Sequence, residues 1–212
     1  MDIIDIDTDI ANFNGMTQFN GATIRTRMGY RHVYHLMDNF SLRSNSNNMS
    51  YRATEATGQQ LTWGASVEFP VGDDSLTLGI DSADTIHDAV IRNPNMAMFR
   101  IQNFADAERD IYGFFTEWKG SRGDWELEAG VRYNHVEMNS DEVSASGMMG
   151  MMGMQANQLA NDFNNANRDQ NFDNIDIVLK ATRPLNASTD FNVGLGRKNR
   201  APSYQELYLW LP

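Results

Sequence analysis

Cysteine is absent from this chain of 212 residues, which excludes disulfides, zinc–thiolate sites and a thiol nucleophile. Basic residues are scarce too: 17 lysines and arginines stand against 28 aspartates and glutamates, for a net charge of −11. A nucleic-acid-binding protein needs a basic face that displaces counterions from phosphates. We therefore expect no nucleic-acid partner. No G-x-S-x-G motif occurs, so a hydrolase triad of that type has no anchor.

Long apolar runs are missing as well. None approaches the roughly 18 residues that a membrane-spanning helix needs. Residues 1–10 are acidic and lack the basic start and apolar core of a signal peptide, so no export signal is expected within these residues. Proline is rare, whereas Gly, Asn, Asp and Ser are plentiful. This composition favours strands joined by many turns.

Strict alternation of apolar and polar residues recurs along the chain. From Leu61 to Phe69 every odd-numbered residue is apolar and every even-numbered residue is small, polar or charged. The same pattern returns in 76–80, 125–134, 175–180 and 191–195. A period of two predicts strands with one apolar and one wet face. We count about eight such strands of roughly ten residues, the length that crosses a bilayer when tilted.

The connections between these strands differ in length. Short turns follow residues 69, 119 and 181, whereas polar stretches at 40–58, 89–104 and 139–171 predict long loops. Because short and long connections alternate, all the long loops fall at one end of the sheet. This is the arrangement of an all-β, antiparallel, up-and-down transmembrane barrel.

A soluble β-sandwich also alternates and is the main structural alternative. The wet face, however, carries charged residues, as a polar barrel lumen does. The apolar face carries aromatic residues near the strand ends, as the girdle of an outer-membrane barrel does; these are Phe69, Trp118, Trp125 and Tyr133. The alternation then predicts Leu61, Trp63, Val67, Trp125, Leu127 and Val131 on a convex, lipid-facing side, and Glu68, Glu126, Glu128 and Arg132 on the concave side.

The last residues, 207–212, form an apolar run for which we expect no partner within the chain. An open sheet with two unpaired edges is not viable in lipid. We therefore interpret the chain as an internal part of a larger barrel.

His35 and Met37 form a candidate metal site. On the strand expected over residues 30–39, residues two apart share a face, whereas His32 points to the other side. An imidazole with a thioether suits copper better than calcium or magnesium. An incidental pair is the alternative.

A second candidate is the methionine cluster of residues 147–154, which contains Met148, Met149, Met151, Met152 and Met154. Glycine at every third position predicts a loop there and not a helix. Thioethers bind Cu(I), while a low-complexity loop without a ligand is the alternative. Met96 and Met98 add a second soft patch at the same end.

Three segments resemble the barrels of TonB-dependent receptors. Residues 194–208 (GLGRKNRAPSYQELY) resemble their G-x-x-R-x-x-R-x-P-S-x-x-E-L-Y segment, and residues 110–118 (DIYGFFTEW) resemble a strand of the same barrels. Residues 35–43 (HLMDNFSLR) resemble the H-x-M-D-N-(aromatic)-S-L-R segment of the copper-receptor branch.

The resemblance implies that residues 1–212 are the central part of a 22-stranded barrel domain, without its plug domain and closing strands. The parent would be an active transporter of the cell outer membrane, embedded in lipid and energised by TonB through the absent plug. It would be no enzyme and would use no catalytic cofactor. Copper would be its transported ligand, shared between His35, Met37 and soft ligands of the plug. The alternatives are a receptor for siderophores or other metal chelates, and a passive porin or structural barrel.

Overall fold

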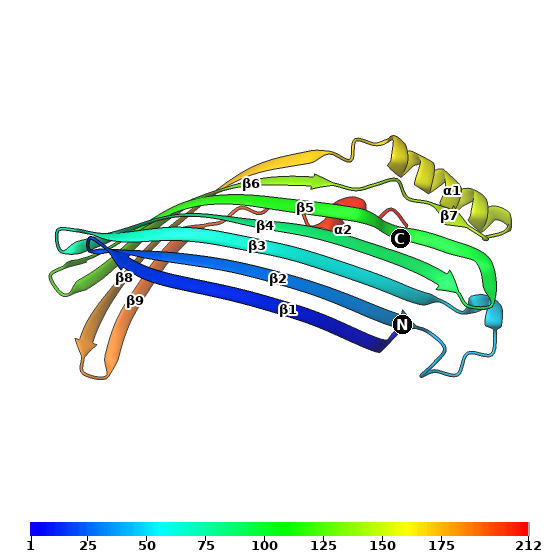
Figure 1. The fold of residues 1–212 in the computed structure, drawn as a ribbon, viewed down its shortest axis with the longest axis horizontal. Coiled ribbons are helices and arrows are strands. Elements are labelled where there is room, and N and C mark those ends of the chain that lie inside the picture. The colour runs from blue at the N-terminus through cyan, green and yellow to red at the C-terminus, as the bar shows by residue number, and fades with distance from the viewer. Residues whose placement is uncertain (212) are drawn as a thin grey trace.

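The chain forms one curved antiparallel sheet (Figure 1). The computed structural model describes residues 1–211. Eight long strands follow one another across the sheet in chain order: β1 (Asp2–Phe19), β2 (Ala22–Asp38), β3 (Ala53–Val71), β4 (Asp74–Asn93), β5 (Met96–Arg122), β6 (Trp125–Asn139), β8 (Gln170–Asn186) and β9 (Thr189–Arg197). The short β7 (Ala145–Ser146) pairs with β5. The predicted up-and-down meander of about eight strands is thereby confirmed.

Tight turns join the strands at one end of the sheet. Between β1 and β2, Asn20 (φ 49°) and Gly21 (φ 81°) are both left-handed, as a two-residue type I′ turn requires. The turns that join β3 to β4, β5 to β6 and β8 to β9 lie at the same end (Figure 1). Each short turn keeps its two strands in the register that the alternation needs.

Longer connections lie at the opposite end. Residues 39–52 join β2 to β3 and contain the 3-10 turn η1 (Asn48–Ser50). Residues 140–169 join β6 to β8 and contain β7 and the helix α1 (Gly150–Asn165). The predicted first and third long loops are thus present, although β3 already begins at Ala53.

The predicted long loop at 89–104 was wrong. There β4 continues to Asn93 and β5 begins at Met96, so only two residues join them. The ladder between β4 and β5 shifts register between His87 and Val90. Such a bulge interrupts the period of two without ending the strand, so the sequence pattern there is that of a loop. The strands are also longer than the roughly ten residues expected: β5 has 27.

The ladder register defines the two faces of the sheet. Directly paired residues share a face, and following these pairs from β3 to β6 separates Trp63 from Glu68. The predicted partition is confirmed: Leu61, Trp63, Val67, Trp125, Leu127 and Val131 lie on one face, and Glu68, Glu126, Glu128 and Arg132 on the other. The sheet is curved (Figure 1). On the face of the charged set, Asp81 of β4 reaches side chains of β2 and β6, as residues on a concave surface do. We call this concave side the inner face and the opposite side the outer face.

The apolar run near the end of the chain has a partner, contrary to expectation. The helix α2 (Tyr204–Tyr208) lies against β5 on the inner face (Figure 1). Tyr208 is 2% exposed and packs with Phe104, Ala107 and Met138. Trp210 is 6% exposed, and its indole N–H donates to the Gln102 carbonyl oxygen at 2.9 Å. A short amphipathic helix therefore folds this run back onto the wall.

Neither α1 nor α2, the helices within residues 1–211, is long and apolar enough to cross a membrane.

The two faces predict opposite responses to a buried charge. Leu78 lies on the outer face, whereas its neighbour Thr77 lies on the inner face between Glu68 and Glu117. In the full-length protein we expect Leu78→Lys to lower the free energy of unfolding from liposomes by about 2–4 kcal/mol, the cost of a lysine facing lipid near the bilayer centre. Thr77→Lys should change it by less than about 1 kcal/mol. Equal losses in the two variants would contradict the assignment of the faces.

Candidate metal-binding site

His35 and Met37 lie on the inner face near the end of β2, and both are half-buried. His35 pairs with Ala56 of β3, and Met37 pairs with Thr54. His32 lies on the opposite face, where its Nδ1 is 4.0 Å from a carboxylate oxygen of Asp9. The shared face predicted for His35 and Met37 is therefore confirmed, while their role as ligands stays a prediction.

Another thioether, that of Met1, lies at Thr54 and was not among the predicted site residues. The Thr54 hydroxyl donates to the sulfur of Met1 at 3.1 Å, and Thr54 is the direct partner of Met37. The Met1 side chain thus reaches the ladder partner of Met37. Nothing in the local pattern of residues 1–3 reveals this, because the neighbourhood arises from the pairing of β1, β2 and β3.

His87 is a further inner-face residue to which the sequence assigned no role. Its ring lies 4.5 Å from the Tyr204 ring of α2 and 5.1 Å from the Phe104 ring, measured between centroids. On β3 it faces Gly58, two residues from Ala56, the partner of His35. The bulge at His87 obscures its face in the sequence. The aromatic packing makes His87 part of the wall beneath α2.

The donors gathered here are soft. Within residues 1–211, no group of three or more His, Asp, Glu or Cys side chains is arranged to hold a metal ion. The His35–Met37 pair offers one imidazole and one thioether, a set that favours copper over hard cations. Two donors do not complete a coordination shell, so a metal ion held here would need further ligands.

The methionine cluster is partly helical, so the predicted loop was wrong. Met149 caps α1, and Met151, Met152 and Met154 lie in its first turns. Gly150 has φ +68° and begins the helix, while Gly153 is buried close to the Met148 carbonyl group. Gly150 thus provides the positive φ at the start of the helix, and Gly153 allows the close approach of the Met148 carbonyl group. The residues that follow the cluster continue the helix.

The helix α1 is anchored by the side that faces away from its exposed methionines. Ala160 and Phe163 pack toward the wall formed by β5 and the tail after α2, and Ala156 is buried as well. Met148 joins that apolar cluster. The other four methionines are exposed to solvent by 70–80%: Met149, Met151, Met152 and Met154. Met98 is 81% exposed, and its carbonyl oxygen accepts a hydrogen bond from Ser146 at 2.8 Å.

The structure does not bring the two candidate sites together. His35 and Met37 lie on β2, whereas α1 follows β6, with β3, β4 and β5 between them in the sheet. Both are at the end of the sheet that carries the long connections (Figure 1). The methionines of α1 therefore form a separate, solvent-facing patch.

Farther along the inner face, charged residues cross-link the wall. Asp81 of β4 accepts from Arg27 at 3.2 Å and from Arg132 at 2.5 Å, so one carboxylate joins β2, β4 and β6. The side chain of Asp81 is only 10% exposed. A Cβ atom at Gly64 would lie 2.8 Å from Arg27 Nε, so the glycine lets this arginine lie flat across β3. The inner face is thus polar at this level, and two guanidinium groups share one carboxylate.

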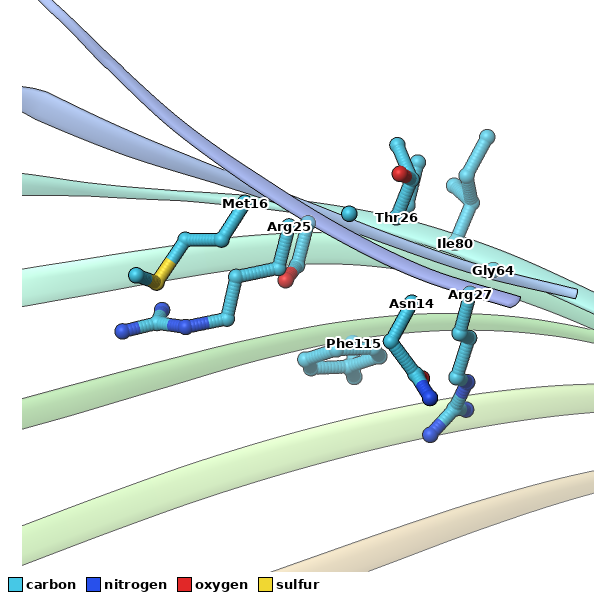
Figure 2. A pocket seen from close by; sticks show the side chains of 11 residues that line it. Asn14, Met16, Arg25, Thr26, Arg27, Gly64, Ile80 and Phe115 are labelled. Atoms are coloured by element: carbon cyan, nitrogen blue, oxygen red, sulfur yellow. The ribbon is translucent and has the colours of Figure 1, made fainter. Parts of the chain in front are cut away.

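A cavity of about 340 Å³ lies beside this lattice. Figure 2 shows Met16, Arg25, Arg27 and Phe115 on its inner side, with Thr26 and Ile80 pointing to the other face of the sheet. Arg25 is paired with Glu68 at 2.7 Å. Both arginines of the cavity therefore have a carboxylate partner, which Arg27 shares with Arg132.

The tail after β9 is braced by an internal ion pair, which we call the latch. Both terminal nitrogens of Arg200 donate to the Glu206 carboxylate, at 2.6 and 2.8 Å. Glu206 also accepts from the Ser203 backbone N–H, and the Ser203 hydroxyl accepts from the Glu206 N–H, which completes a capping box. Hydrogen bonds from Arg200 and Ser203 lower the pKa of Glu206 to about 2. Burial raises the pKa of Tyr208 to about 12.

The comparison with known families settles which class of protein has this sheet. A family model described as "TonB dependent receptor-like, beta-barrel" matches residues 3–211. The chain belongs to this family. The match confirms the predicted family. This family is a class of receptors and not of enzymes, which is consistent with the expectation of a non-enzymatic protein.

A solved structure has the same TonB-dependent receptor fold. It is the "Copper transporter OprC", which aligns with a TM-score of 0.70 and 20% sequence identity. The alignment covers 95% of this chain and 31% of that chain, so the present chain spans about a third of the neighbour's length. At this identity the likeness shows the fold. No curated protein sequence matches the chain.

The latch predicts a pH dependence. A carboxyl group whose pKa is lowered by folding stabilises the folded state at pH values above its ordinary pKa, which is 4.5 for Glu206. This stabilisation is lost as the pH falls through the folded-state pKa of about 2. In full-length protein that keeps Trp210 as its sole tryptophan, we expect the fluorescence to stay constant down to pH 4 and to change near pH 2. Arg200→Gln should move this change toward pH 4.5. An unshifted change in that variant would contradict the latch.

Proposed function

We propose that this chain is the central wall of the barrel of an outer-membrane, TonB-dependent transporter for copper. The observation that carries the proposal is the combination of an unclosed sheet, an outer face that is apolar next to the tight turns, and soft donors on the inner face. Family membership supports the barrel, and H-x-M at residues 35–37 on the inner face supports the copper.

The open edges support the proposal that the barrel is larger than this sheet. Within residues 1–211, β1 and β9 each pair with one strand only. In a bilayer an unpaired edge would leave backbone N–H and C=O groups without partners. Further strands of a 22-stranded barrel would close these edges, and a plug domain would connect the inner face to TonB.

The metal would be handled at two places. His35 and Met37 are the proposed tight site, completed by soft ligands of the plug. The methionines of α1 are the proposed outer collecting site, because four thioethers exposed to solvent at the loop end can exchange Cu(I) with the medium. The acidic balance of the chain would raise the local concentration of cations at this mouth.

A receptor for an anionic metal chelate is the second candidate. The arginines that line the cavity of Figure 2 would favour it if they were free. Arg25 and Arg27 are instead paired with Glu68 and Asp81. This pairing favours the copper ion over the chelate.

The copper assignment is tested by ligand substitution in the full-length receptor. Met37→Ala removes one thioether and should weaken Cu(I) binding at least about tenfold, ~1.4 kcal/mol, measured by competition with a chromogenic chelator. Met16→Ala is the matched control, since Met16 lies on the same face one strand away, opposite Arg25. Unchanged affinity in Met37→Ala would remove the H-x-M assignment and leave a receptor of another substrate.

The collecting site is tested separately. Replacing Met148, Met149, Met151, Met152 and Met154 by Leu keeps the helix apolar but removes its sulfur. We expect the tight site to keep its affinity, while additional weak Cu(I) equivalents are lost and uptake at low copper falls. Equal stoichiometry in the variant and the parent would refute a role for this patch.

The barrel assignment predicts the behaviour of residues 1–212 expressed alone in water. Their outer face would lack lipid and their two edge strands would lack partners, so we expect aggregation or an unfolded chain. Sedimentation and thermal unfolding provide the measurement. A soluble monomer with a cooperative transition would support a sandwich instead.

A further inference from the structure

The chain turns sharply directly after Met37, around a buried carboxylate. Asp38 is 4% exposed. It accepts the backbone N–H of Phe40 at 3.0 Å and that of Ser41 at 2.9 Å, as well as the Ser41 hydroxyl. One carboxylate thereby satisfies three donors in the three residues that follow. Such a turn fixes the backbone direction at the end of β2.

The next residue closes the base of the loop. The Asn39 side chain donates to the Ser50 carbonyl at 3.0 Å and accepts from the Arg52 N–H at 2.9 Å. The Asn39 N–H also donates to the Arg52 carbonyl at 3.2 Å. These bonds extend the pairing of β2 with β3 just beyond the pair that contains Met37. They keep Met37 opposite Thr54.

The loop is also tied to β1. Arg43 donates from Nε to Asp2 at 2.7 Å and from Nη2 at 2.5 Å. Asp2 is the ladder partner of Asp38, and Ile3 is the partner of Met37. A planar guanidinium on a carboxylate fixes two directions at once. Met37 is therefore held in register from both neighbouring strands.

We infer that Asp38 and Asn39 are positioning residues for the Met37 thioether, a role that rests on the proposed copper function. Met37 lies one pair from the end of each ladder, where strands fray most readily. His35 lies two residues deeper in the same strand. The turn thus acts mainly on the sulfur ligand and much less on the imidazole.

The test is an Ag(I) titration of the full-length receptor, with Ag(I) as a redox-inert probe of a Cu(I) site. Asp38→Ala should lower the affinity about 10–100-fold, the effect usual for residues that orient a metal ligand. Asp38→Asn, which retains one acceptor oxygen, should recover part of it. Ser41→Ala, which removes one of the three donors, is a milder second variant in case Asp38→Ala folds poorly. Asp73→Ala in the exposed β3–β4 turn at the opposite end is the control.

A double-mutant cycle separates positioning from general stability. If Asp38 acts through the thioether, Asp38→Ala should change the affinity by less than about twofold once Met37 is already alanine. A full additional loss in the Met37→Ala background would overturn the inference, because Asp38 would then act on the whole wall.

Hydrogen exchange keeps this inference distinct from the proposed function. Without any metal, Asp38→Ala should accelerate amide exchange in residues 35–41 and leave the β3–β4 turn unchanged. Unchanged exchange would overturn the positioning role whatever the metal does. A different outcome is faster exchange together with an Ag(I) affinity that neither Met37→Ala nor Asp38→Ala alters. That outcome would overturn Met37 as a copper ligand and, with it, the inference, and the turn would then be a structural element only.

Discussion

The pairing of backbone groups between neighbouring strands is the constraint on which the rest of this structure depends. A strand that faces lipid cannot give its N–H and C=O groups to water, so each must find them a partner in the next strand. Eight long strands meet this demand by following one another in chain order. The register that results is strict, because a slip by one residue would exchange the lipid face with the inner face.

This constraint also explains how the inner face is built. Next to the tight turns, where the outer face carries apolar side chains such as Val67, Leu78 and Val131, the charged side chains lie on the inner face. Opposite charges on this face are paired across strands: Asp81 of β4 accepts hydrogen bonds from Arg27 of β2 and from Arg132 of β6. Glycine at position 64 makes room for this lattice. Nearer the loops, α2 and the tail cover an apolar part of the same face.

Where the regular pairing ends, local turns take over, and the candidate site lies at this boundary. His35 is inside the ladder, whereas Met37 is next to its end. Asp38 and Asn39 form the turn that holds that end. A ligand at the end of a strand can be oriented and still adjust to a metal, because only a few hydrogen bonds hold it. The regular pairing of the strand and the local hydrogen bonds of the loop thus meet at Met37.

By itself the sequence determined the faces of the strands, the tight turns and the family, because these depend on residues close together in the chain. Alternation over 61–69 was enough to place Trp63 and Glu68 on opposite sides, and H-x-M was enough to place His35 and Met37 on one face. The sequence did not reveal the bulge at His87, since a bulge breaks the very period that is being read. It also did not reveal α1, whose glycines argue against a helix but whose Ala160 and Phe163 pack on the wall. Only the tertiary structure decided these features, because burial against distant strands supplies the stability that local propensity lacks.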